Sequence, residues 1–153
     1  MKKFVAVLLA AMLCLSFAAC GGDKATDKTV DAAAMFQALL TDVTYTDNAT
    51  ELDSSMAGVL LGGELPDGTE TYLAANDSAY LRCAVFACKD KDAAAAVKKL
   101  IQTYIDDSID AKYNVDEVAL LQNAKIHSMG NYVAVAVTSD TDNVNKVIDQ
   151  YFA

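Results

Sequence analysis

Residues 79–111 read AYLRCAVFACKDKDAAAAVKKLIQTYIDDSIDA, and they decide the fold because a strand passes almost directly into a long helix. Residues 79–88 are mostly apolar, with a β-branched and aromatic centre, which predicts a strand. Asp90 is placed to cap a helix that runs to about Ala111. The helix has one apolar face with a period of 3.6 residues. This face consists of Ala93, Val97, Leu100, Ile101, Tyr104, Ile105 and Ile109.

A strand precedes this unit and a hairpin follows it. Residues 69–75 predict a strand that Asn76-Asp77-Ser78 joins to residues 79–88. Residues 125–129 and 132–138 predict two further strands. Their connection, Gly130-Asn131, puts glycine first, as a type II′ turn requires. We therefore expect two β-hairpins, each followed by a helix.

Helices are also predicted at both ends of the domain. Residues 30–43 have helical spacing, residues 44–50 are polar and turn-like, and residues 52–60 suggest a short helix that Gly62-Gly63 stops. A short helix also suits residues 115–121. Ser139 or Asp140 is placed to cap a final helix. Its inward residues are Val144, Val147, Ile148, Tyr151 and Phe152.

The predicted order is α-α-β-β-α-β-β-α. It indicates an α+β fold in which a four-stranded antiparallel sheet, built from the two hairpins, packs against helices. Residues 30–153 are long enough for one domain with a core, and two domains are not expected.

The N-terminal segment has the layout of a signal peptide. Lys2 and Lys3 precede an uncharged, mostly apolar run, residues 4–19, which is short for a stable membrane span. Ala18-Ala19-Cys20 resembles the lipobox of bacterial lipoproteins, although Phe17 stands where leucine is usual. The resemblance implies that residues 1–19 are removed and that Cys20 carries a lipid such as palmitate. The alternatives are an ordinary signal peptide that is cut nearby and an uncleaved anchor.

A lipid on Cys20 would hold the protein at the extracytoplasmic face of a cell membrane, with residues 20–29 as a flexible tether. Lys2 and Lys3 would leave with the signal, so ten cations would face 21 acids, a net charge of −11. Such a charge opposes nucleic acid as a partner. Cys83 and Cys88 lie five residues apart in one predicted strand and point to opposite faces, so we expect no disulfide between them.

Catalytic and metal-binding patterns are not found in the sequence. The single histidine, His127, lacks the companions of a catalytic triad or a zinc site. Asp140-Thr141-Asp142-Asn143 begins like a calcium loop, but Asn145 and Tyr151 stand where such a loop needs glycine and glutamate. We therefore expect no catalytic residues, no metal and no cofactor.

The two faces of the predicted sheet differ in composition. One phase would form a core with Leu73, Cys83, Val85, Val133, Val135 and Val137. The other phase places aromatic residues among small ones and suggests a shallow binding face for a peptide or glycan. The residues proposed for this face are Tyr72, Tyr80, Arg82, Phe86 and Tyr132. The alternative is that the two N-terminal helices cover it.

Two motifs carry a resemblance to a known family. Ala84-Val85-Phe86 leads into Lys89-Asp90 and an alanine-rich helix, and Gly130-Asn131-Tyr132-Val133 precedes a short terminal helix. Together with the signal layout, they resemble a family of small Gram-positive lipoproteins, domain of unknown function 4358, over residues 30–152. The resemblance implies an exported lipoprotein and brings no known activity.

The sequence favours a non-enzymatic domain that binds an unknown protein, peptide or glycan outside the membrane. One alternative is an enzyme, or a subunit of one, that acts on a cell-wall or glycan substrate through Asp and Glu residues. Such an enzyme would need two carboxylates about 5–9.5 Å apart across a cleft. A third hypothesis is an accessory protein of a membrane complex.

Overall fold

The computed structural model describes residues 29–111 and 114–153. These residues form a mixed α/β fold in which five helices pack around one antiparallel sheet. The elements are α2 (Ala32–Asp42), β1 (Thr50–Leu52), α3 (Met56–Leu61), β2 (Glu70–Ala75), β3 (Leu81–Ala87), α4 (Lys91–Asp110), α5 (Val115–Asn123), β4 (Lys125–Met129), β5 (Tyr132–Ala136) and α6 (Thr141–Phe152). The short helix expected after residue 115 is confirmed as α5.

The sheet has five strands in the order β1-β2-β3-β5-β4, so the prediction of four strands was wrong. The added strand is β1, whose Leu52 pairs with Leu73 of β2. Residues 44–50 had been interpreted as a turn, and Leu52 as part of a helix. Strand β1 has only three residues and is largely exposed, so it shows no alternation that could identify it.

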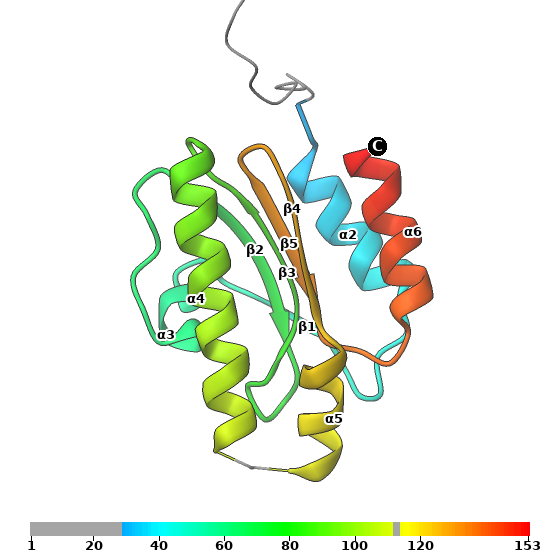
Figure 1. The fold of residues 1–153 in the computed structure, drawn as a ribbon. Helices are drawn as coiled ribbons and strands as arrows, with labels where there is room; N and C mark the ends of the chain where they lie inside the picture. The colour runs from blue at the N-terminus through cyan, green and yellow to red at the C-terminus, as the bar shows by residue number, and fades with distance from the viewer. Residues whose placement is uncertain (1–28, 112–113) are drawn as a thin grey trace, which may run out of the picture.

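Helices cover both faces of the sheet (Figure 1). Helices α2 and α6 lie on one face, while α4, with α3 and α5 beside it, covers the other. The predicted apolar face of α4 is confirmed, with Val97 and Ile101 fully buried. Asp90 caps α4 as predicted, because its carboxylate accepts a hydrogen bond from the N–H of Ala93 at 2.7 Å.

The predicted division of side chains between the two sheet faces was wrong for β3. Leu73 lies opposite Ala84, and Ala84 lies opposite Val135, so these residues share the α4 face. Cys83 and Val85 instead lie on the face covered by α2 and α6. Strand β3 is apolar on both sides, and its sequence therefore gives no indication of which side faces which helix.

The β4–β5 turn is confirmed at Gly130, which has φ = 58°, as the first position of a type II′ turn requires. Asp140 stands at the N-cap position of α6 but does not cap it. Its carboxylate accepts a hydrogen bond from the N–H of Thr44 at 2.9 Å. This bond joins the end of α2 to the start of α6.

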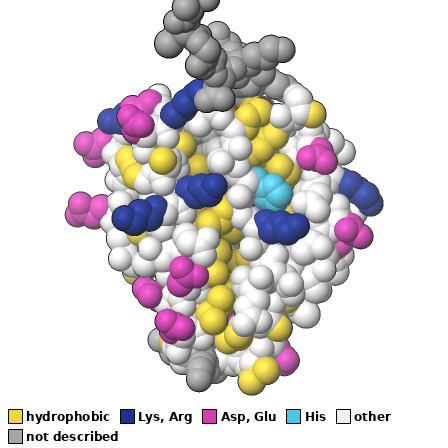
Figure 2. All heavy atoms as spheres, in the orientation of Figure 1, with side chains coloured by type: hydrophobic (Ala, Val, Ile, Leu, Met, Phe, Trp, Pro, Cys, Tyr) yellow, Lys and Arg dark blue, Asp and Glu magenta, His cyan; other side chains and the backbone are white. Residues whose placement is uncertain are grey.

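The two ends of the domain differ (Figure 1). The N-terminus of α2, the C-terminus of α6 and the β4–β5 turn lie at one end. The other end, called the distal end here, contains the β2–β3 loop, α5 and the C-terminal part of α4. Figure 2 shows acidic side chains over this part of α4, with basic side chains higher on the same face. Among the described residues, no helix combines the length and apolar character that a membrane crossing needs.

Candidate functional site

The five residues of the predicted binding face do not lie together. Tyr72 and Tyr132 pack in the cluster with α2 and α6, whereas Phe86 is fully buried on the α4 side. Arg82 is only 1% exposed, and Tyr80 lies at the distal end. These residues therefore do not form the open binding face that the sequence suggested. Helices do cover the sheet, but the helix that accompanies α2 is α6, because α3 packs on the opposite side.

Arg82 forms a buried ion cluster at the distal end. Its Nε and Nη2 bind the carboxylate of Asp47 at 2.6 and 2.9 Å, and its Nη1 and Nη2 bind Glu117 at 2.8 and 2.9 Å. Its Nη1 also donates to the carbonyl of Leu81 at 3.2 Å. These bonds use all five N–H donors of the guanidinium. Arg82 therefore has no donor left for a ligand.

The ion cluster stabilises the distal end, because the charge of Arg82 is balanced by two carboxylates from other segments of the chain. Burial opposes the charge on Arg82, but hydrogen bonds to Asp47 and Glu117 outweigh it and raise the pKa of Arg82. The hydrogen bond from Arg82 lowers the pKa of Asp47 to about 2. The cluster joins the segment after α2 to β3 and α5, and so fixes the distal end.

The β2–β3 loop is held by Asn76, which contacts the same cluster. Its side-chain N–H donates to Asp47 at 2.6 Å, and its side-chain oxygen accepts from the N–H of Tyr80 at 2.9 Å. In this loop Ala79 has φ = 61°, a left-handed conformation that residues other than glycine rarely adopt. These bonds fix the position of Tyr80.

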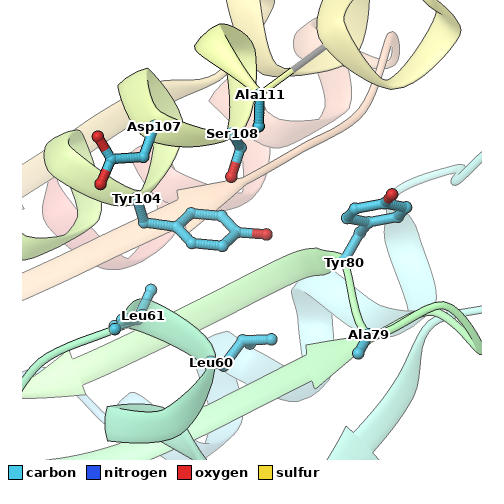
Figure 3. Close-up of a pocket in the computed structure, with 9 residues that line it drawn as sticks. Leu60, Leu61, Ala79, Tyr80, Tyr104, Asp107, Ser108 and Ala111 are labelled. Carbon is cyan, nitrogen blue, oxygen red and sulfur yellow. The ribbon is translucent and has the colours of Figure 1, made fainter. Parts of the chain in front are cut away.

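A hollow of about 290 Å³ lies beside Tyr80, between α3, the β2–β3 loop and the C-terminal half of α4 (Figure 3). We call it the Tyr80 pocket. Its described lining residues are Leu60, Leu61, Gly62, Ala79, Tyr80, Tyr104, Asp107, Ser108 and Ala111. It is smaller than most pockets for drug-sized ligands, which measure about 300–1,000 Å³, so it suits one ring or one side chain.

Tyr104 is the fixed wall of the pocket. Its hydroxyl accepts a hydrogen bond from the N–H of Leu81 at 3.1 Å and also bonds Ser108. Burial raises the pKa of Tyr104, so the hydroxyl stays protonated at neutral pH. Figure 3 shows this hydroxyl directed toward Tyr80, while the carboxylate of Asp107 points away from Tyr80.

Two glycines let α3 form the opposite wall. Gly62 ends the helix with φ = 72°, which confirms the predicted stop. A Cβ atom on Gly63 would lie 2.6 Å from Cδ1 of Leu100, so the chain after α3 approaches α4 closely. The sequence indicated where α3 ends, but this contact with α4 was not predicted.

The other residues considered from the sequence do not join this site. Half-buried His127 lies on edge strand β4, and its Nε2 is buried without a partner among the described residues. Cys83 and Cys88 are free and buried, on opposite sides of the sheet, and burial raises the pKa of Cys83 to about 12. Within residues 29–111 and 114–153, no three His, Cys, Asp or Glu residues gather as a metal site would require. Cys20 lies outside the described residues.

The sequence contained one signal for the ion cluster. Arg82 is a charged residue within an apolar strand, and buried charges require partners. Its partners could not be identified, because Asp47 and Glu117 each lie 35 residues away in segments with several other acids. Tyr104 and Ser108 had been assigned only to a helix.

The comparisons with known proteins identify one domain. Residues 67–138 match the family model described as domain of unknown function (DUF4358). No curated protein and no solved structure gave a significant match. The match begins in the turn before β2 and ends just after β5, and it contains Tyr80, Tyr104 and Arg82. The chain is therefore similar to DUF4358 over residues 67–138.

Proposed function

We propose that this protein is a lipid-anchored binding domain on the extracytoplasmic face of a cell membrane, and that the Tyr80 pocket is its ligand site. The anchor rests on the signal layout of residues 1–19 and on Ala18-Ala19 before Cys20. Its ligand is a peptide or a glycan outside the membrane.

The position of the pocket carries this proposal. The Tyr80 pocket lies at the distal end, opposite the N-terminus of α2, to which the tether connects. A tether of residues 20–29 spans at most about 35 Å when fully extended. With an anchor at Cys20, the pocket would lie at the end of the domain that is farther from the point where the tether joins it, where an extracytoplasmic ligand can reach it.

Catalysis by Asp and Glu residues gains no support from the site. The two carboxylates that the fold brings together at the distal end, Asp47 and Glu117, both bind Arg82. With a pKa of about 2, Asp47 has no proton to donate at neutral pH. A general acid would need a raised pKa.

The anchor is tested by Cys20→Ala, with Cys14→Ala as the control that removes the other cysteine of the N-terminal segment. We expect Cys20→Ala to prevent palmitate labelling and to leave unprocessed precursor or release the protein from membranes. The control should behave as wild type. A Cys20→Ala protein that is processed normally and stays on the membrane would contradict the anchor.

The binding site is tested with a panel of peptides and glycans and two matched variants. Tyr80→Ala changes the pocket, whereas Tyr151→Ala makes the same change in α6, outside the pocket. We expect at least one class of ligand to bind the wild type and the control but not Tyr80→Ala. If every ligand that binds does so equally to both variants, the pocket is not the binding site.

A further inference from the structure

We infer that the Tyr80 pocket selects a positively charged ligand, namely an ammonium group on a short aliphatic chain, as in a lysine side chain of a peptide. This inference rests on the binding function proposed above and narrows its ligand to one chemical class. It follows from the side chains that line the pocket and from the end of helix α4.

The described lining residues offer negative and aromatic groups but no cation. Asp107 is the acid among them, and Tyr80 and Tyr104 supply two aromatic rings. No described residue of the lining is Lys, Arg or His, and Arg82 nearby is fully occupied. Lys112 and Tyr113 lie outside the described residues. The charge among the described lining residues therefore favours a cation over an anion.

The end of α4 adds a negative potential beside the pocket. The C-terminus of a helix carries a partial negative charge, which basic residues usually balance. The last turn of α4 has no basic residue, and Asp106 and Asp110 accompany Asp107 there. The acidic side chains that Figure 2 shows over this part of α4 extend the same field. A bound cation would relieve this repulsion.

The shape of the pocket suits an aliphatic chain with a charged end. Leu60 and Leu61 form an apolar wall opposite Tyr104 (Figure 3). A methylene chain would pack on this wall while its ammonium group stays at the rim, as long basic side chains do on proteins. At the rim it would meet the ring of a tyrosine and lie in the negative field of Asp107, whose carboxylate points away from Tyr80. Tyrosine rings attract cations within about 6 Å of their centre.

The test compares probes that differ only in charge. The full-length chain, purified in detergent, is titrated with a short peptide that contains one lysine and with the same peptide carrying Nε-acetyl-lysine. We expect the acetylated peptide to bind roughly tenfold more weakly or worse. Acetylation removes the positive charge that is attracted both to the tyrosine ring and to the acidic end of α4. Added salt should weaken binding of the lysine peptide.

Matched variants separate the pocket from the overall charge of the protein. Asp107→Asn and Asp92→Asn change the net charge equally, but Asp92 lies in the first turn of α4, far along the helix from the pocket. We expect a loss of roughly tenfold for Asp107→Asn and none for Asp92→Asn. Equal losses for the two variants would overturn the inference.

The outcomes also separate this inference from the proposed binding function. If a neutral glycan or peptide binds in a manner that depends on Tyr80, while the lysine peptide does not bind, the cationic ligand is refuted and the binding site stands. If no probe binds in a manner that depends on Tyr80, both are refuted.

Discussion

Replacing Arg82 by methionine should lower the free energy of unfolding by about 3–5 kcal/mol, because the change leaves a buried carboxylate without its partner. The side chain of Glu117 is 9% exposed and loses two hydrogen bonds to the guanidinium. Asp47 also loses two bonds, but its side chain is 40% exposed and can be rehydrated. Its share is therefore at most about 1 kcal/mol.

A second substitution tests whether the orphaned charge is the cause. In the double variant Arg82→Met/Glu117→Met, no buried carboxylate remains, and apolar side chains fill a similar volume. Such replacements of buried ion pairs are often neutral or stabilising. We therefore expect the double variant to regain most of the stability that Arg82→Met loses.

The assay is urea unfolding followed by circular dichroism at neutral pH. Lys99→Met, which removes an exposed charge from α4, serves as the control and should stay within about 0.5 kcal/mol of wild type. The reasoning is refuted if Arg82→Met costs less than about 1 kcal/mol, or if the double variant is no more stable than the single one.

Three further predictions follow from the same geometry. The folded state lowers the pKa of Asp47 from 3.8 to about 2, so the contribution of this carboxylate to the free energy of unfolding should be complete above pH 3.8 and lost as the pH falls through 2. In urea unfolding, Asp47→Asn should therefore be less stable than wild type by about 1 kcal/mol at neutral pH, and its stability should depend less on pH in this range. Ala79→Gly should stabilise the protein by about 1 kcal/mol, because glycine adopts the positive φ of 61° at this position without backbone strain. The control Ala96→Gly, at an exposed site within α4, should destabilise it by about as much, and equal effects of the two variants in thermal unfolding would show that Ala79 is not strained. Cys83 and Cys88 should react with a thiol reagent only after urea unfolds the domain, because both are buried and burial raises their pKa values. Labelling of either cysteine in the native protein, detected by mass spectrometry after brief exposure to the reagent, would contradict this prediction.

The sequence predicted best those elements that a local pattern identifies, such as apolar residues at helical spacing or a glycine in a tight turn. Helix α4 is long and has a single apolar stripe, so its face and its cap were both found. The β4–β5 turn was found because Gly130 is placed where only a positive φ fits. In each case the information lies within a few adjacent residues.

Long-range pairing decided what the sequence could not show. Both sides of β3 are buried, so only its pairing with Leu73 and Val135 reveals which side faces α4. The cluster around Arg82 and the Tyr80 pocket each combine segments that are distant in the sequence. Their residues were visible as tyrosines and acids, but no local pattern indicated which of them meet.

The boundaries of the DUF4358 match have a consequence for the site. The matched residues 67–138 supply Tyr80, Tyr104 and Asp107, whereas Leu60 and Leu61 come from α3, before the match begins. Asp47, which holds Arg82 and Asn76, also lies before it. The matched domain thus contributes the aromatic and acidic side of the pocket, and the preceding segment contributes its apolar wall. A protein that joins residues 67–138 of this chain to a different preceding segment would keep the first side and change the second. If the cationic ligand is correct, such a protein would retain the preference for charge but differ in the aliphatic chain that it accepts.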